Sequence, residues 1–158
     1  MNLSLLVILP ILNALLLLPF KEAKQVRLIT LAGAVVQFIL CFFLLYLFWQ
    51  EKITGNTSLM LFENNYKWYA PLNINFHTGV DGISVSMILL TAFVVLAGIL
   101  VSWKQEKLSK EFFFLLLFLS AGAYGFFISL DLFTLFFFLE LAVIPKFLLI
   151  GIWGSGKK

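Results

Sequence analysis

The chain has 158 residues, of which 62% are hydrophobic and 12% are charged, and its formal net charge is +3. Soluble domains carry about a quarter charged residues, so this composition excludes an ordinary soluble domain and predicts an all-α membrane protein. The positive charge does not indicate a nucleic-acid partner, because most lysines lie next to apolar spans, where the positive-inside rule accounts for them. The single cysteine, Cys41, excludes an internal disulfide.

Two apolar stretches come first, at residues 3–20 and 29–49. The first contains Pro10 and Asn13, and it lacks the basic region and the cleavage site of a signal peptide, so we interpret it as a retained membrane helix. The second contains Gln37 as its one strongly polar side chain. We expect Gln37 to face a neighbouring helix.

Residues 50–80 form the one long polar segment. Near its end Leu72, Ile74 and Phe76 alternate with polar residues, which is the period of a strand. We therefore expect a short strand or hairpin outside the membrane. His77 has no second histidine, cysteine or carboxylate at metal-ligand spacing, which favours a solvated or turn-stabilising role and predicts no metal site.

Asp81 directly precedes the third apolar stretch, at residues 82–103. Aspartate is a favoured N-cap residue, so we predict a structural role for Asp81 as the cap of this helix. The fourth stretch, at residues 112–130, contains Ala121 and Gly125 four positions apart. Small residues at this spacing allow another helix to approach closely.

Residues 132–153 read LFTLFFFLELAVIPKFLLIGIW, a run of 22 residues. At ~1.5 Å per residue this helix would be about 33 Å long, enough to cross a bilayer core of about 30 Å. Only a tight turn near residues 129–131 can separate it from the fourth stretch.

Glu140 lies near the middle of that span, where an ionised group costs on the order of 3 kcal/mol. An ionisable residue at this depth is a functional hypothesis by default, and a proton-relay carboxylate is the role it suits. The alternative is a permanently neutral glutamic acid that is hydrogen-bonded to a neighbouring helix.

Two further residues of this span bear on its function. Pro145 has no N–H and its ring clashes with the carbonyl of Leu141, so we expect it to shape the helix by breaking it locally. Lys146 adds a second ionisable group. Six residues at about 100° each place Glu140 and Lys146 roughly 120° apart around the helix, so we expect them to face different partners.

The stretches together predict a single transmembrane domain, 1–158, with five helices at about 3–20, 29–49, 82–103, 112–130 and 132–153. By the positive-inside rule the N-terminus and the 50–80 loop lie outside, and the C-terminus is cytoplasmic. The basic residues that set this orientation follow the first, third and fifth helices: Lys21, Lys24, Arg27, Lys104, Lys107, Lys110, Lys157 and Lys158.

The chain contains no phosphate-binding glycine loop, no CxxC pair, no pair of membrane histidines for haem and no nucleophile with a matching base. We therefore expect no catalytic residue, no cofactor-binding residue and no metal ligand in this chain.

Two segments nevertheless resemble a known family. FHTGVDGIS at 76–84 and LDLFTLFFFLELAVIPKFLLIGIWG at 130–154 are similar to the N-terminal region of the antiporter-like proton-pumping subunits of NADH:quinone oxidoreductase, respiratory complex I. The resemblance covers essentially the whole chain. It implies a subunit of about fourteen helices with two inverted five-helix repeats, each carrying a broken helix and buried lysines.

In that family the glutamate of the fifth helix is a proton-pathway residue that couples to a lysine on the later broken helix, and the matching position here is Glu140. The sequence stops at Lys158, before that broken helix, so we expect an N-terminal fragment or one piece of a split subunit. Lys146 stands where the family is usually apolar. It either snorkels toward the membrane surface or substitutes for a partner charge, and it joins Glu140 as a candidate proton-pathway residue.

The resemblance implies that the partners are the other membrane-arm subunits of complex I and the lipid bilayer. NADH, FMN, iron–sulfur clusters and quinone are then expected elsewhere in the complex. It favours the cell membrane of a bacterium over the mitochondrial inner membrane.

Two other interpretations stay open. One is a subunit of a multi-subunit cation/proton antiporter or of a membrane-bound hydrogenase, which are homologous to this family. The other is a helical scaffold in which Glu140 only binds its neighbours.

Overall fold

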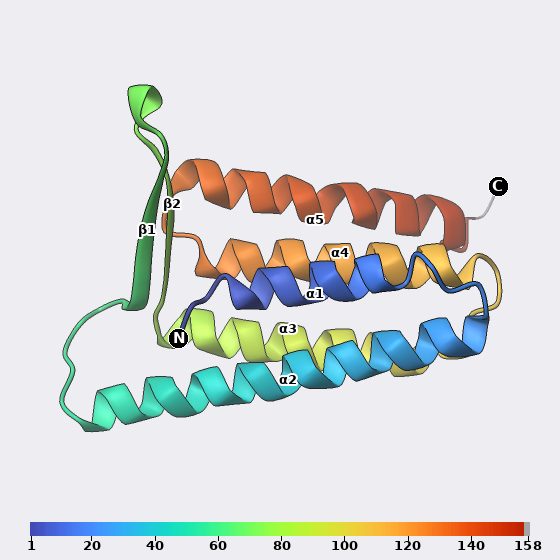
Figure 1. Cartoon of the computed structure of the whole chain (residues 1–158), viewed down its shortest axis with the longest axis horizontal. Helices are drawn as coiled ribbons and strands as arrows, with labels where there is room; N and C mark the ends of the chain where they lie inside the picture. Colours follow the sequence, from blue (N-terminus) through green and yellow to red (C-terminus); the bar gives the residue numbers. More distant parts are fainter. Residues whose placement is uncertain (157–158) are drawn as a thin grey trace.

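The computed structural model describes residues 1–156 and shows five helices that lie side by side, with a two-stranded hairpin at one end (Figure 1). The hairpin stands across the ends of the helices and extends beyond them. The elements in chain order are α1 (Leu5–Leu16), α2 (Ala23–Ile53), β1 (Leu61–Tyr69), a short 3₁₀ helix (Ala70–Leu72), β2 (Ile74–Val80), α3 (Gly82–Val101), α4 (Ser109–Ile128) and α5 (Leu132–Trp153).

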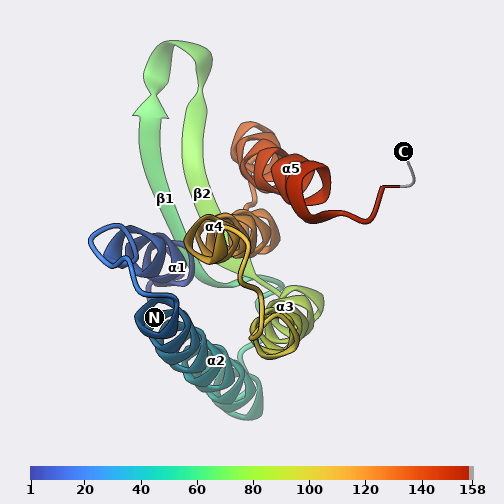
Figure 2. The same ribbon diagram turned by 90° about the vertical axis from the view of Figure 1, so that its right-hand side faces the viewer.

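Helix α4 lies at the centre of the bundle and packs against the other four helices (Figure 2). Its small residues explain the close packing. A Cβ at Gly122 would lie 2.7 Å from the backbone nitrogen of Ala142 in α5, and a Cβ at Gly125 would overlap the ring of Phe138. The predicted close approach is confirmed at Gly125, whereas Ala121 is buried in the hydrophobic core and Gly122 supplies the other contact.

The first predicted span is longer than the helix that forms. Helix α1 has 12 residues, about 18 Å of regular helix, which is shorter than a bilayer core of about 30 Å. Tighter turns extend it at both ends, with Leu6 N–H bonded to Leu3 and Leu18 N–H bonded to Leu15. Pro19 disfavours the helical conformation in the residue before it and ends the segment.

The other four helices are each long and apolar enough to cross a membrane, among the residues that the structure describes. Helix α5 covers the same residues as the predicted span at 132–153, and α4 ends one residue before the predicted turn at 129–131. Helix α2 has 31 residues and runs past both ends of its apolar stretch at 29–49.

The predicted hairpin is confirmed, although its second strand begins at Ile74 rather than at Leu72. Strands β1 and β2 are antiparallel, with Asn65 opposite His77. Asn73 adopts a left-handed conformation at the tip, which asparagine tolerates well, and this ends the short 3₁₀ helix before β2 starts.

The prediction that Pro145 breaks its helix is wrong. Helix α5 continues from Leu132 through Pro145 to Trp153, and Pro145 is one of its three buried residues. Pro145 still removes the backbone hydrogen bond to the carbonyl of Leu141. No side chain in residues 1–156 donates a hydrogen bond to that carbonyl in its place.

Candidate functional site

Helix α5, which carries the candidate proton-pathway residues, buries only one narrow side. Thr134, Phe138 and Pro145 are its buried residues. Figure 2 shows α5 at the edge of the bundle, next to α4. Because its other sides are exposed and mostly apolar, they are free to contact lipid or further helices.

Glu140 lies on the exposed side of α5. At about 100° per residue it is ~200° around the helix from Phe138, and therefore points away from α4. Its carboxylate forms no salt bridge and no side-chain hydrogen bond within residues 1–156. The structure thus does not bring Glu140 together with any other predicted site residue.

Lys146 is also exposed on α5 and makes no ion pair with any residue in the described part of the chain. It lies one position after the buried Pro145, about 100° from the side that packs on α4. Glu140 and Lys146 accordingly occupy different sides of one helix, and each side is open to a different neighbour.

The start of α5 is fixed by strand β2, which lies against the α4–α5 turn. The N–H of Leu130 donates to the carbonyl of His77 at 2.8 Å, and Thr134 Oγ1 donates to the carbonyl of Asn75 at 3.2 Å. Asp131 caps the helix by accepting from the N–H groups of Phe133 and Thr134. The two sequence motifs, at 76–84 and 130–154, therefore meet in space and set the position of α5.

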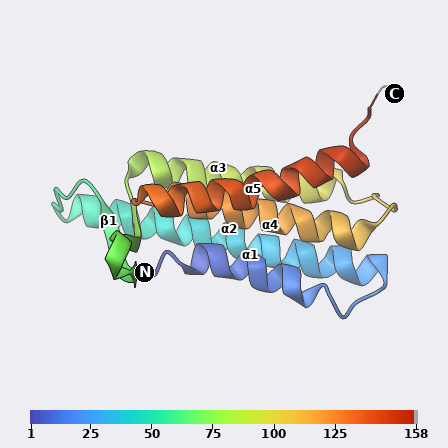
Figure 3. The same ribbon diagram turned by 90° about the horizontal axis from the view of Figure 1, so that it is seen from above.

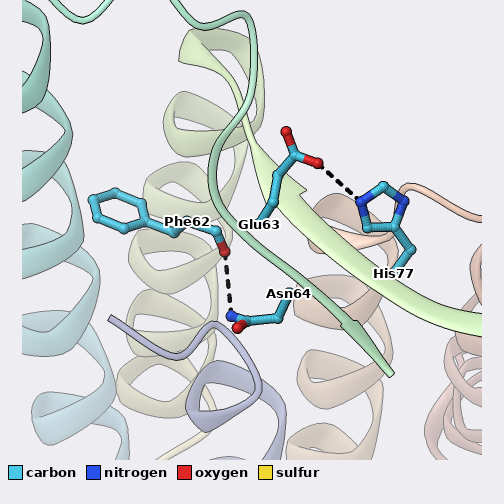
Figure 4. A network of polar contacts seen from close by, with 4 residues as sticks. All are labelled: Phe62, Glu63, Asn64 and His77. Atoms are coloured by element: carbon cyan, nitrogen blue, oxygen red, sulfur yellow. Dashed lines mark hydrogen bonds and ion pairs between the residues drawn. The ribbon is translucent and has the colours of Figure 1, made fainter. Parts of the chain in front are cut away.

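His77 itself bridges the two strands of the hairpin (Figure 4). Its Nε2 lies 2.9 Å from the carboxylate of Glu63, and both side chains are partly exposed. Nearby, Asn64 donates to the carbonyl of Phe62, whose φ of 57° marks an irregularity in β1. The His77 side chain is thus partly solvated, as one of the two expected roles requires, and it contacts the opposite strand instead of stabilising a turn.

Asp81 is the N-cap of α3, as predicted. Its Oδ1 accepts a hydrogen bond of 2.8 Å from the N–H of Ser84. This bond favours the ionised carboxylate and lowers the pKa of Asp81 below its usual value.

Gln37 faces a neighbouring helix, as predicted, but the sequence did not identify the group that it contacts. Gln37 of α2 faces α1, and its Nε2 donates to the carbonyl of Leu6 at 3.0 Å. Leu6 lies four residues before Pro10, so this is the carbonyl that loses its helical partner when position 10 is proline. The amide of Gln37 therefore replaces the hydrogen bond that Pro10 removes. A proline in one apolar stretch and an amide side chain in the next are the sequence features that could have predicted this contact.

At the end of the bundle opposite the hairpin (Figure 1), basic side chains donate hydrogen bonds to backbone carbonyls of neighbouring segments. Lys110 Nζ donates to Leu18 at 2.8 Å and to Phe20 at 3.3 Å, just after α1. Arg27 donates to Gln105 in the α3–α4 loop at 3.1 Å. Figure 3 shows both loops and the end of α5 at this side. These contacts join the loops that carry the positive charge.

Several known proteins with a similar sequence have the same description. No protein-family model matches the chain. It is 36% identical over 154 residues to NAD(P)H-quinone oxidoreductase chain 4 of the chloroplast of Mesostigma viride, covering 96% of this chain and 30% of that protein. It is 35% identical over 158 residues to a chain 4 of Microcystis aeruginosa, covering 99% and 28%. The chain is homologous to the N-terminal part of NAD(P)H-quinone oxidoreductase chain 4.

Solved structures agree with this homology. The chain matches a subunit of respiratory complex I from Thermus thermophilus with a TM-score of 0.75 and 26% identity, over 96% of this chain and 29% of that chain. It also matches a chain of the membrane-bound sulfane sulfur reductase, an archaeal respiratory membrane complex, with a TM-score of 0.71 and 23% identity, over 99% and 31%. The second likeness shows the fold alone.

These findings confirm the resemblance to the antiporter-like subunits of complex I, and in particular to chain M, called chain 4 in mitochondria. The chain 4 homologues and the four long apolar helices together indicate a multi-pass membrane protein. The chain spans about 30% of the length of the curated relatives it matches.

Proposed function

We propose that this chain is part of the membrane arm of a proton-translocating NAD(P)H:quinone oxidoreductase, and that Glu140 contributes a carboxylate to its proton pathway. The observation that carries the proposal is the position of Glu140, exposed near the middle of a 22-residue apolar helix in a homologue of chain 4.

The energetics of Glu140 support a protein or water neighbour instead of lipid. An ionised carboxylate facing hydrocarbon at this depth would cost on the order of 3 kcal/mol. The outer side of α5 must therefore contact polar groups. In this proposal, those groups belong to helices in the part of a chain 4 subunit that lies beyond the matched region. A carboxylate between helices can bind and release protons as neighbouring charges change.

The anchoring of α5 supports the same role. Strand β2 fixes its first turn through Leu130 and Thr134, and Gly122 lets its backbone approach α4 closely. Glu140 thus stands on a helix that is held rigidly from one side. Rigid elements position functional groups more accurately than loops do.

Lys146 is a second candidate for the pathway. Its side chain is exposed on a different side of α5 from Glu140, so in this proposal it contacts a different neighbouring helix or subunit. From that side it can either substitute for a partner charge or reach the membrane surface.

The remaining parts of the proposal follow from the relatives. The partners are other membrane-arm subunits, as in the multi-subunit respiratory complexes that the chain matches. The nicotinamide nucleotide, FMN, iron–sulfur clusters and quinone act elsewhere in the complex. We place the chain in a bacterial cell membrane, with the N-terminus and hairpin outside and the basic end in the cytoplasm.

A cation/proton antiporter or a membrane-bound hydrogenase would use the same fold. The names of the relatives favour the quinone oxidoreductase, since the two quoted above are both chain 4 of that enzyme.

Affinity purification of the chain from its native membranes tests this choice. We expect flavin- and iron–sulfur-containing subunits to co-purify with it. Capture of cation-antiporter subunits without redox cofactors would contradict the proposal. The intact mass, compared with 18.0 kDa for this sequence, shows whether the natural polypeptide is longer.

A further inference from the structure

A small cavity lies inside the bundle, away from α5 and from the proposed proton-pathway residues. Its volume is about 10 Å³, and it lies between α1, α2, α3 and α4. A cavity of roughly 10–15 Å³ on this measure is the smallest that accepts one water molecule. The cavity therefore has room for a single water and nothing larger.

One wall of the cavity carries a buried polar atom that lacks a partner. Gln37 is only 4% exposed, and its Nε2 is already bonded to the carbonyl of Leu6. Its Oε1 accepts no hydrogen bond from any group in residues 1–156. Leaving a buried acceptor without a donor costs its full desolvation penalty, so a donor at this oxygen would be favourable.

The other polar groups around the cavity suit a water and not an ion. Asn13, Ser120 and Tyr124 line it together with Gln37, and no charged side chain of the described residues does. Ser120 donates its own proton to the carbonyl of Leu117 at 2.6 Å, which leaves its oxygen free to accept. Tyr124 also lines the cavity, and a tyrosine hydroxyl can donate one hydrogen bond. A buried water needs two to four such partners.

We propose that this cavity binds one ordered water molecule, which donates to Gln37 Oε1 and bonds to the surrounding side chains of Asn13, Ser120 and Tyr124. The water joins three helices. Gln37 belongs to α2 and holds the Leu6 carbonyl of α1, while Ser120 and Tyr124 belong to α4. The water therefore extends the hydrogen-bonded chain that starts at the Leu6 carbonyl, which Pro10 leaves without a helical partner, and continues through Gln37 to α4.

The test is a cryo-EM map of the intact native complex, at a resolution that shows ordered waters between other helices of the same chain. We expect a peak at about 2.7–3.2 Å from Gln37 Oε1. In a matched map of the Gln37→Met variant, which keeps a similar side-chain length without the amide, the peak should be lost while the other waters remain.

Two results would overturn the inference. One is an empty cavity in the native map when waters elsewhere are resolved. The other is a peak that persists unchanged in Gln37→Met, because the water would then not depend on that acceptor. If Gln37→Met does not assemble, Tyr124→Phe replaces it, and a weaker peak is expected in that map because one donor is gone. An unchanged peak in Tyr124→Phe would equally overturn the assignment.

Discussion

At the scale of single residues, the hydrogen bond from Gln37 to the Leu6 carbonyl can be tested with a second substitution that restores the lost bond. Gln37→Leu leaves that carbonyl unsatisfied and should cost about 1–3 kcal/mol of stability. In a Pro10→Ala background the cost should be smaller, because the N–H of Ala at position 10 can bond to Leu6 within the helix. The thermal unfolding midpoints of the natural chain, the two single variants and the double variant, all in one detergent, measure this. Equal losses in both backgrounds would show that Gln37 does not serve the Leu6 carbonyl.

Asp81 gives a second prediction, on the stability of the start of α3. Asp81→Ala should lose about 1 kcal/mol because the N–H of Ser84 loses its acceptor. Asp81→Asn keeps an acceptor and should lose less.

The same residue predicts a pH dependence. The folded-state pKa of Asp81 lies below its unfolded value, so its contribution is fully present above the ordinary aspartate value of about 4 and is lost as the pH falls through the lowered value. The loss of stability on acidification should therefore be smaller in Asp81→Asn than in the natural chain. Identical acid sensitivity would contradict the assignment.

These two residues also show what the sequence could predict at this scale. The cap of Asp81 is local, with its partner three residues away, and the N-cap preference is enough to find it. The partner of Gln37 is 31 residues away, so a polar residue in an apolar stretch predicts a helix contact without identifying the atom. Glu140 was found from its depth alone, and its direction away from α4 needed the packing of α5.

At the scale of elements, the contact between α4 and α5 depends on Gly122. Gly122→Ala should separate the two helices, because the added Cβ would lie 2.7 Å from a backbone nitrogen of Ala142. A backbone contact cannot relax by a side-chain rotation, so a cost of about 1–3 kcal/mol is expected. Thermal unfolding of the complex measures it.

Gly98→Ala in α3 is the matched control, because a Cβ there meets nothing within 4 Å. It should be neutral or stabilising by up to about 1 kcal/mol, since alanine favours a helix over glycine. Equal effects of the two substitutions would mean that α5 does not approach α4 as described.

Hydropathy predicted four of the helices well, because a long apolar run has few alternatives in a membrane protein. It overestimated α1, where Pro19 and the tighter terminal turns shorten the regular helix to 12 residues. It also could not show that β2 lies on the α4–α5 turn, since the hydrogen bond between Leu130 and His77 joins distant parts of the chain.

At the scale of the whole molecule, the orientation in the membrane can be tested with single cysteines. Cys41 is buried and is replaced by serine to give a background without thiols. Thr57→Cys lies at the hairpin end and Glu106→Cys at the basic end, and both positions are exposed. A membrane-impermeant maleimide applied to intact cells should label position 57 and spare position 106. The reverse pattern would contradict the assignment of the basic end to the cytoplasm.

The central claim is that Glu140 carries protons, and the most direct measurement is proton pumping per electron in the native complex with Glu140→Gln. We expect the complex to assemble in normal amounts, with pumping strongly reduced, because glutamine keeps the size and hydrogen bonding of the side chain but cannot release a proton. Glu140→Asp, which keeps a carboxylate, should retain part of the activity. Unchanged pumping in Glu140→Gln, or a fall in the amount of complex with normal pumping per complex, would contradict the account and leave Glu140 a structural residue.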